Sequence, residues 1–233
     1  MTGLRFDPER LRPAEYVCEP DPRSTMFVKI DRTNGTSRDI ELADHHEGIS
    51  KYVLHAGVPE EIVVQFETAR NVYLYAWFIY RFYAVAEHQS LACLELALRE
   101  RLKAEIKAGK IKRGRPTLHP LLQYAIGHGL LKNEGFSAWR NRGEIRSRSR
   151  VEMEKIREAT EKKLDKITWD ESDIRVTPED LDWDYAKMLA EILPESRNGY
   201  AHGSTELYSV AALQTIRVVC EIINQLFEFP KGD

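Results

Sequence analysis

The chain has 233 residues, of which 42% are hydrophobic and 30% are charged, and its formal net charge is −3. This length allows one or two domains with a sizeable core, and the composition is typical of globular proteins. The slightly acidic balance gives no sign of a nucleic-acid-binding surface spread over the whole molecule, so any such surface must be local.

The cysteines, the histidines and the apolar segments give no sign of disulfides, a bound metal or a membrane span. The three cysteines are scattered, and Cys93 and Cys220 lie in apolar helical patterns, which predicts buried thiols in a reducing compartment. No secretory signal is expected from residues 1–13, and no stretch reaches the roughly 18 apolar residues of a membrane span. The seven histidines are dispersed and no Gly-rich phosphate loop is present. We therefore expect a cytoplasmic protein with no membrane segment, no metal and no cofactor.

The first 58 residues form one predicted unit, an N-terminal arm with a β-hairpin. Residues 1–25 contain four prolines and many charges, which favours an extended or partly disordered arm. Apolar residues then alternate on both sides of Asn34-Gly35, which predicts a hairpin that must lean on other elements for stability. His45 and His46 follow and are expected to be solvated in a polar turn.

A continuous helical pattern without Gly or Pro runs over residues 60–107. As one helix it would be about 70 Å long, so we expect a kink, a break or projection into a partner. Its first half, residues 66–83, is rich in aromatic side chains on several faces. This favours a buried core or a dimer interface, although such a cluster also has the chemistry to stack unpaired bases.

The middle of the chain alternates between apolar and charged patterns. A short helix is predicted from Thr117 or Leu118 to Gly135, and a Glu/Lys-rich helix is predicted after Val151. The segment between them contains five arginines within eleven residues: Arg140, Arg142, Arg146, Arg148 and Arg150. One interpretation is a solvated, salt-bridged helix, and the other is a local phosphate-binding surface.

Two helices are predicted near the C-terminal end of the chain. Thr177, Pro178 and Asp180 form a capping-box pattern that begins a helix, which we expect Pro194 to end. A last apolar helix is predicted over residues 207–229. Between them lies the segment Glu195–Ser204, which contains Arg197 and His202.

The Arg197–His202 segment has the equipment for proton transfer beside a phosphate. A guanidinium is permanently charged and fits a phosphate with its planar fork, and an imidazole can accept or donate a proton near neutrality. On a straight helix, side chains five residues apart point about 140° from each other. The glycines at 199 and 203 are able to bend the chain, so the local geometry stays open at this point.

Arg197-Asn198 followed by Ala201-His202-Gly203 resembles the Arg-x4-6-His signature of HEPN domains. Residues 86–101 are similar to the long helix that precedes this signature in Abi-like HEPN proteins. The resemblance implies an all-α antiparallel helical bundle with a long central helix, here joined to the small N-terminal hairpin. The bundle would occupy residues 59–233, with a charged helical insertion around 136–180.

The resemblance also implies an activity and its residues. Many HEPN proteins are metal-independent endoribonucleases of toxin–antitoxin or phage-defence systems, and they work as homodimers with a composite site. His202 would be the general acid or base, Arg197 would stabilise phosphoryl charge, and Asn198 would orient the substrate or the histidine. A carboxylate on an earlier helix would hold Arg197, and the candidates are Glu95 and Glu87.

Three functions remain open from the sequence. The first is an endoribonuclease that forms a 2′,3′-cyclic phosphate on its RNA substrate, with an antitoxin or defence-system partner. The second is a catalytically inactive HEPN module that binds RNA or a protein. In the third, the chain is a structural interaction protein whose partner surface is the aromatic helix 66–83, with Arg197 and His202 in a helix-boundary turn.

Overall fold

The computed structural model describes residues 5–31, 35–111, 116–164, 166–167, 170–201 and 209–228, with the backbone alone for 198–201. Within these ranges the fold is mainly α-helical with one two-stranded antiparallel sheet. The longer helices are α1 (Leu42–Ser50), α2 (Glu60–Tyr75), α3 (Phe82–Arg101), α5 (Leu118–Gly127), α7 (Arg142–Lys162), α9 (Tyr185–Ala201) and α10 (Ser209–Leu226). The short elements are α4 (Lys103–Lys107), α6 (Ser137–Arg140), α8 (Pro178–Leu181) and 3₁₀ turns at Ala14–Tyr16, Ser24–Met26, Asn133–Gly135 and Glu171–Asp173.

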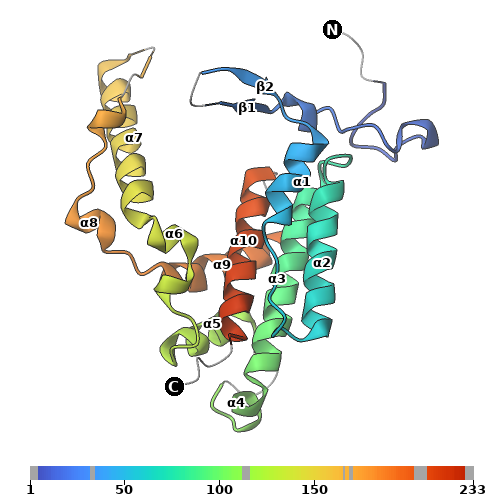
Figure 1. Cartoon of the computed structure of the whole chain (residues 1–233), viewed down its shortest axis with the longest axis vertical. Coiled ribbons are helices and arrows are strands. Elements are labelled where there is room, and N and C mark those ends of the chain that lie inside the picture. The colour runs from blue at the N-terminus through green and yellow to red at the C-terminus, as the bar shows by residue number, and fades with distance from the viewer. Residues whose placement is uncertain are drawn as a thin grey trace.

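The centre of the molecule is α3, which is covered on different sides by α2, α10, α5 and α9 (Figure 1). Its buried positions recur at helical spacing through Leu91, Leu94 and Leu98, all of which have no exposed surface. Facing them are Phe66 on α2 and Ile216 on α10, both also fully buried. The prediction of an all-α bundle with a small hairpin is confirmed.

The hairpin consists of β1 (Val28–Ile30) and β2 (Ser37–Asp39), as predicted around the Asn-Gly pair. Lys29 and Arg38 lie opposite each other across the two strands, an arrangement that repels on its own. Asp44 on α1 accepts hydrogen bonds from both side chains, at 2.7 Å from Lys29 Nζ and 2.6 Å from Arg38 Nη1. This shared carboxylate attaches the hairpin to the helices.

The pattern over residues 60–107 is broken into α2, α3 and α4, which resolves the expectation of an overlong helix. The break after Tyr75 contains no Gly or Pro, and its backbone is held by Asp21 from the N-terminal arm. The Asp21 carboxylate accepts from the backbone N–H of Tyr80 at 3.2 Å, and the Asp21 N–H donates to Trp77 O at 3.0 Å. The aromatic residues therefore fall on several faces because they belong to two helices and the turn between them.

The described part of the N-terminal arm, residues 5–25, contacts this turn through Asp21 and is irregular apart from two 3₁₀ turns, and the expectation of an extended or partly disordered arm stays a prediction. Asp21 has no exposed surface and Phe6 is 8% exposed. Burial of Asp21 opposes ionisation, but hydrogen bonds from Arg23 and Tyr80 hold its pKa below the ordinary value. A salt-bridged carboxylate thus joins the start of the chain to the bundle.

His45 was also predicted wrongly, because it lies in α1 and packs into the core side of that helix. Its ring stacks on Tyr73 at a centroid distance of 4.6 Å, and Nε2 lies 2.9 Å from Tyr73 O. Burial lowers the pKa of His45 below 6.5. His46, the neighbouring position, is exposed as expected.

Helix boundaries differ from the predictions in three places. The helix that begins at Leu118 ends at Gly127, and α7 starts at Arg142 rather than after Val151. The Thr177 capping box is present but begins only the four-residue α8. Asp184 then caps a separate helix, α9, by accepting from the N–H of Lys187 at 3.2 Å.

The most consequential difference concerns Pro194, which was expected to end a helix and instead lies inside α9. A proline cannot donate to the carbonyl four residues earlier, here that of Ala190. His119 Nδ1 on α5 lies 3.0 Å from that oxygen and replaces the missing donor. The helix α9 continues past this proline to Ala201 and carries Arg197.

Cys93 and Cys220 are buried thiols, as predicted. Burial raises the pKa of each to about 12, so both remain protonated at neutral pH.

Candidate functional site

The candidate site forms where α9 crosses α3, two helices that are in contact. Arg197 comes from the last two turns of α9, and Glu95 comes from the second half of α3. Arg197 Nε lies 3.1 Å from Glu95 Oε2. The two atoms form a close ion pair without an aligned hydrogen bond.

Glu95 is shared by two guanidinium groups. Besides Arg197, it accepts from Arg99 Nη2, one turn further along α3. Arg99 also donates to the carbonyl of Pro116 at 3.0 Å. One carboxylate between two permanently charged arginines leaves the cluster with a net positive charge.

Exposure differs strongly within this cluster. The side chain of Glu95 is 6% exposed, whereas those of Arg99 and Arg197 are 22% and 35% exposed. A buried carboxylate of this kind needs a cation, because an unpaired buried charge costs several kcal/mol, of the order of 3–5. Glu95 thus binds both arginines from the buried side, and the side chain of Arg197 is the more exposed of the two.

Glu87, the other candidate for this role, is buried two turns earlier on α3. Its Oε1 accepts a hydrogen bond from Thr215 Oγ1 on α10 at 2.8 Å. Among the described side chains, the acidic partner of Arg197 is therefore Glu95.

Two of the predicted site residues fall where side chains are not described. The side chain of Asn198 and the whole of His202 lie outside the described residues. The backbone of α9 runs as helix through Asn198 and Gly199 to Ala201. The Asn-Gly pair thus does not bend the chain before residue 201, and Ala201 lies one turn beyond Arg197 on the same helix.

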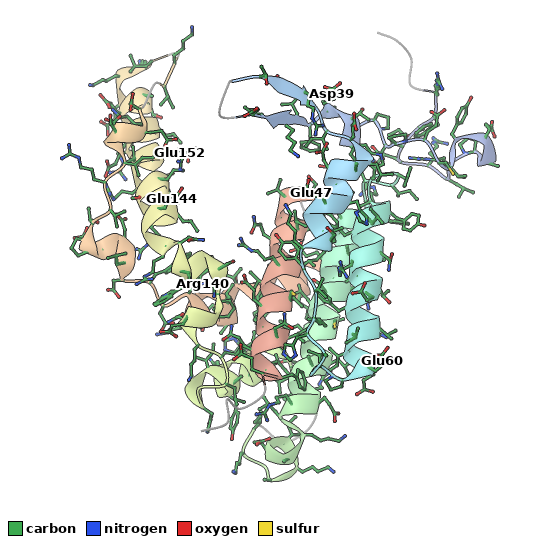
Figure 2. All side chains as sticks on the ribbon, in the orientation of Figure 1. Asp39, Glu47, Glu60, Arg140, Glu144 and Glu152 are labelled. Atoms are coloured by element: carbon green, nitrogen blue, oxygen red, sulfur yellow. The ribbon has the colours of Figure 1, made fainter. Side chains whose placement is uncertain are left out.

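Of the five arginines predicted to bind RNA, Arg140 lies in α6, which packs on the bundle, and the other four lie in α7, which projects from it with α8 alongside (Figures 1 and 2). Several hold the returning segment 171–183 to α7. Arg142 Nε donates to Leu181 O at 2.8 Å, and Arg148 and Arg150 form ion pairs with Glu171 and Asp180 at 2.9 and 3.1 Å. Arg146 Nη1 bonds to Asp182 O and Arg140 Nη1 to Glu134 O, the latter at 2.8 Å.

This network favours the interpretation of a salt-bridged helix over that of an open basic surface. Asp180 as a whole residue is only 3% exposed. The hydrogen bond from Arg150, and then that from the Thr177 N–H, lower the pKa of its carboxyl to about 2. Figure 2 also shows the acidic side chains Glu144 and Glu152 along the same helix. RNA binding by these arginines stays a prediction.

Comparison with known proteins leaves the resemblance as it stood. No family model, no curated protein and no solved structure matches this chain. The HEPN resemblance therefore rests on the ten-residue segment Glu195–Ser204, of which residues 195–201 lie within α9, and on residues 86–101.

Other site classes find no support in the parts of the chain that the structure describes. There is no group of three or more His, Cys, Asp or Glu side chains placed to hold a metal ion among those residues. No helix in the same ranges has the length and apolar character to cross a membrane.

Sequence reasoning missed the roles of His119 and His45. The signal for His119 was the proline itself, because a proline in a helical pattern leaves one carbonyl in need of a donor. The chain gives no local signal that His45 stacks on Tyr73, since the two residues are 28 positions apart.

Proposed function

We propose that the chain is a metal-independent endoribonuclease of HEPN type that works as a homodimer. The observation that supports this best is the ion pair between Arg197 and the buried Glu95. It anchors one side of the guanidinium on the bundle and leaves a third of the side chain exposed. A fixed, partly exposed guanidinium is suited to bind a phosphodiester through paired N–H donors.

In the proposed reaction, the ribose 2′-hydroxyl loses its proton and its oxygen attacks the adjacent phosphorus. The bond from phosphorus to the 5′-oxygen breaks, and that oxygen takes up a proton. The products are a 2′,3′-cyclic phosphate and a 5′-hydroxyl, and DNA is not cut because it lacks the 2′-hydroxyl. His202 transfers the protons, a role typically worth about 10²–10⁴ in rate, and Arg197 stabilises the charge on the phosphoryl oxygens.

Dimerisation would place two copies of the Arg–His pair in one site, and Asn198 would orient substrate or imidazole. The biological setting we propose is a toxin or phage-defence system with an antitoxin or defence partner. Each of these points follows from the HEPN resemblance and from no contact within this chain.

The second candidate is a catalytically inactive HEPN module that binds a protein or RNA. A shallow apolar depression on the outer side of α1 and α2 favours the protein form of this function. It is lined by Leu42, Ala43, His46, Leu74, Tyr75 and Phe78. Leu42 and Tyr75 in this depression are 39% and 58% exposed, so neighbouring apolar side chains are open to a partner there.

The deciding experiment is cleavage of a labelled mixed RNA pool in EDTA by wild type, Arg197→Ala and His202→Ala. Matched controls are Arg157→Ala and His88→Ala, which remove an exposed arginine on α7 and an exposed histidine on α3. We expect wild type and both controls to form 2′,3′-cyclic ends, and both site variants to lose activity by a factor of about 10² or more. No cleavage by folded wild type would favour the binding module, and equal cleavage by all five would exclude this site.

A further inference from the structure

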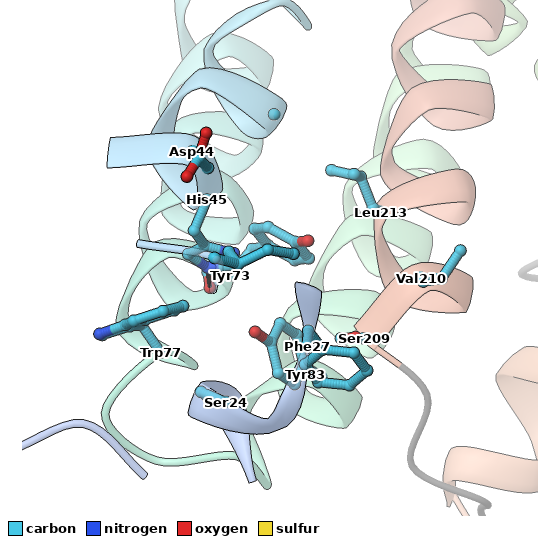
Figure 3. Close-up of a pocket in the computed structure, with 12 residues that line it drawn as sticks. Ser24, Phe27, Asp44, His45, Tyr73, Trp77, Tyr83, Ser209, Val210 and Leu213 are labelled. Atoms are coloured by element: carbon cyan, nitrogen blue, oxygen red, sulfur yellow. Dashed lines mark hydrogen bonds between the residues drawn. The ribbon is translucent and has the colours of Figure 1, made fainter. Parts of the chain in front are cut away.

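A cavity of about 200 Å³ lies between α1, the hairpin, the α2–α3 turn and the start of α10 (Figure 3). Its walls are mainly aromatic: Phe27, His45, Tyr73, Trp77 and Tyr83 all line it. Tyr73, Trp77 and Tyr83 are each 5% exposed or less, whereas Phe27 at the mouth is 36% exposed. The cavity is therefore a recess walled by buried rings and open at one side.

The volume limits what the cavity can hold. An apolar protein cavity of about 150 Å³ accommodates benzene, and small-molecule sites for larger ligands measure about 300–1,000 Å³. A recess of about 200 Å³ thus fits one flat ring system somewhat larger than benzene. Flat heteroaromatic rings bind proteins by stacking on aromatic side chains, which is the chemistry of these walls.

The recess also contains two buried hydroxyl groups. Ser24 lines the cavity and has no exposed surface, and its Oγ makes no aligned hydrogen bond within the described structure. The hydroxyl of Tyr83 approaches it in a hydrogen bond of poor alignment. Ser24 and Tyr83 thus place hydroxyl groups in an otherwise aromatic wall, which suits a ring that carries hydrogen-bonding atoms.

Two cations lie beside one wall of the cavity. Asp44 lines the cavity and binds both Lys29 and Arg38, and Lys29 also pairs with Glu47 at 3.7 Å. The side chains of Lys29 and Arg38 are 51% and 53% exposed, which leaves N–H donors accessible to an anion. A ring inside the recess and a phosphate outside it would each meet suitable groups.

We propose that this cavity binds one nucleobase, with the attached phosphate held by Lys29 and Arg38. The base belongs either to a free nucleotide or to a single-stranded RNA. The RNA form rests on the proposed ribonuclease function, since it would position a substrate strand whose cleavage site is elsewhere. A free nucleotide and a single-stranded RNA both carry the base and the phosphate that the cavity would bind.

Calorimetric titration of the full chain with adenosine, AMP, uridine, UMP, ribose 5-phosphate and indole tests this assignment. We expect both nucleotides to bind, each more tightly than its nucleoside, and ribose 5-phosphate to bind at least about tenfold more weakly than AMP. Indole tests for a simple apolar cavity. If indole binds while adenosine and uridine do not, or if ribose 5-phosphate matches AMP, the proposal is wrong.

Two variants locate the binding. A Cβ at Gly48 would meet Leu213 Cδ2 at 3.7 Å, an ordinary contact, so Gly48→Leu fills the recess, and Gly127→Leu in open space on α5 is its control. We expect Gly48→Leu alone to weaken adenosine binding at least about tenfold. The exposed single variant Lys29→Gln, which keeps the Arg38–Asp44 contact that attaches the hairpin, should weaken AMP binding and leave adenosine binding unchanged. Unchanged binding in the folded variants would overturn the assignment.

A short single-stranded RNA separates the two sources of the base. Stronger binding of RNA than of AMP, lost in Gly48→Leu, would identify a strand as the ligand, whereas binding of AMP without binding of RNA would identify a free nucleotide. Arg197→Ala should abolish cleavage and keep adenosine binding, while Gly48→Leu should raise KM for RNA. Cleavage without nucleoside binding would defeat this inference alone, and nucleoside binding without cleavage would defeat the proposed ribonuclease alone.

Discussion

His119 Nδ1 lies 3.0 Å from the backbone oxygen of Ala190 and thereby joins α5 to α9. This carbonyl is the one that the proline at 194 leaves without a helical donor. The contact lies within two turns of Arg197, so it supports the part of α9 that carries the candidate site.

Replacement of His119 by alanine is expected to lower the free energy of unfolding by about 1–3 kcal/mol, because Ala190 is 2% exposed and its oxygen would lose its donor. Chemical denaturation of both proteins measures the difference. His128→Ala is the control, since that exposed histidine bonds within its own helix end.

The same contact predicts a coupling with Pro194. Pro194→Ala restores an N–H that can donate to Ala190 O, so His119→Ala should cost less in that background. A double-mutant cycle measures this coupling. Equal costs in both backgrounds would show that His119 stabilises α9 through packing alone.

Glu95→Gln is expected to lower the free energy of unfolding by about 2 kcal/mol, less than for a fully buried pair because both arginines are partly exposed. RNA cleavage should also fall, since Arg197 loses the charge that anchors it. Denaturation and cleavage assays on the same preparation measure the two effects.

Glu87→Gln is the matched control, as a buried carboxylate on the same helix that contacts Thr215. It should keep more cleavage than Glu95→Gln. If both variants lose cleavage to the same extent, the effect belongs to α3 as a whole and not to the anchor of Arg197.

Burial of His45 gives a pH dependence with a defined sign. The folded pKa lies below 6.5, so the unfolded chain binds more protons than the folded one as the pH falls below that value. This contribution to stability is complete above pH 6.5 and is lost as the pH falls toward the folded pKa. His45→Phe keeps a ring against Tyr73 but cannot titrate, so its unfolding free energy should fall less steeply between neutral and mildly acidic pH.

Denaturation curves of wild type, His45→Phe and His46→Phe between neutral and mildly acidic pH measure this difference in slope. The exposed His46 variant should keep the slope of the wild type. Identical slopes for His45→Phe and wild type would mean that other groups govern the acid sensitivity.

Arg150→Ala is expected to loosen the segment 171–183 from α7, because Arg150 binds both Asp180 and the carbonyl of Arg175. Hydrogen exchange should speed up in that segment and remain unchanged in α2 and α3. Because the pKa of Asp180 is about 2, the ion pair between Arg150 and Asp180 should persist above about pH 4 and weaken as the pH falls toward 2.

Arg157→Ala, on an exposed position of the same helix, serves as the control. Unchanged exchange in Arg150→Ala, together with weaker and less salt-dependent RNA binding, would instead assign Arg150 to an RNA surface.

The elements that could be predicted from the sequence are those with a local cause. The Asn-Gly hairpin, the Thr177 capping box and the apolar pattern of α10 depend on neighbours within a few residues. The i,i+4 pair of Glu95 and Arg99 is of the same kind.

The errors arise where a distant residue supplies a backbone partner. Asp21 binds the turn between α2 and α3 from 59 positions before Tyr80, and His119 contacts the carbonyl of Ala190 from 71 positions before it. Local propensity does not identify either of these distant partners. The candidate site shows the same difference between local and distant causes. The resemblance predicted that a carboxylate on an earlier helix lies near Arg197. That this carboxylate is Glu95 and not Glu87 follows only from the way in which α9 packs on α3.

The order of the bundle has a consequence for synthesis on the ribosome. The apolar face of α3 is completed by α10, which begins more than a hundred residues later at Ser209. At roughly 5–20 residues per second, the nascent chain exposes that face for on the order of ten seconds before its cover emerges. During this interval the growing polypeptide presents a ready surface to chaperones, and a stalled translation product ending within α7 would be prone to aggregate.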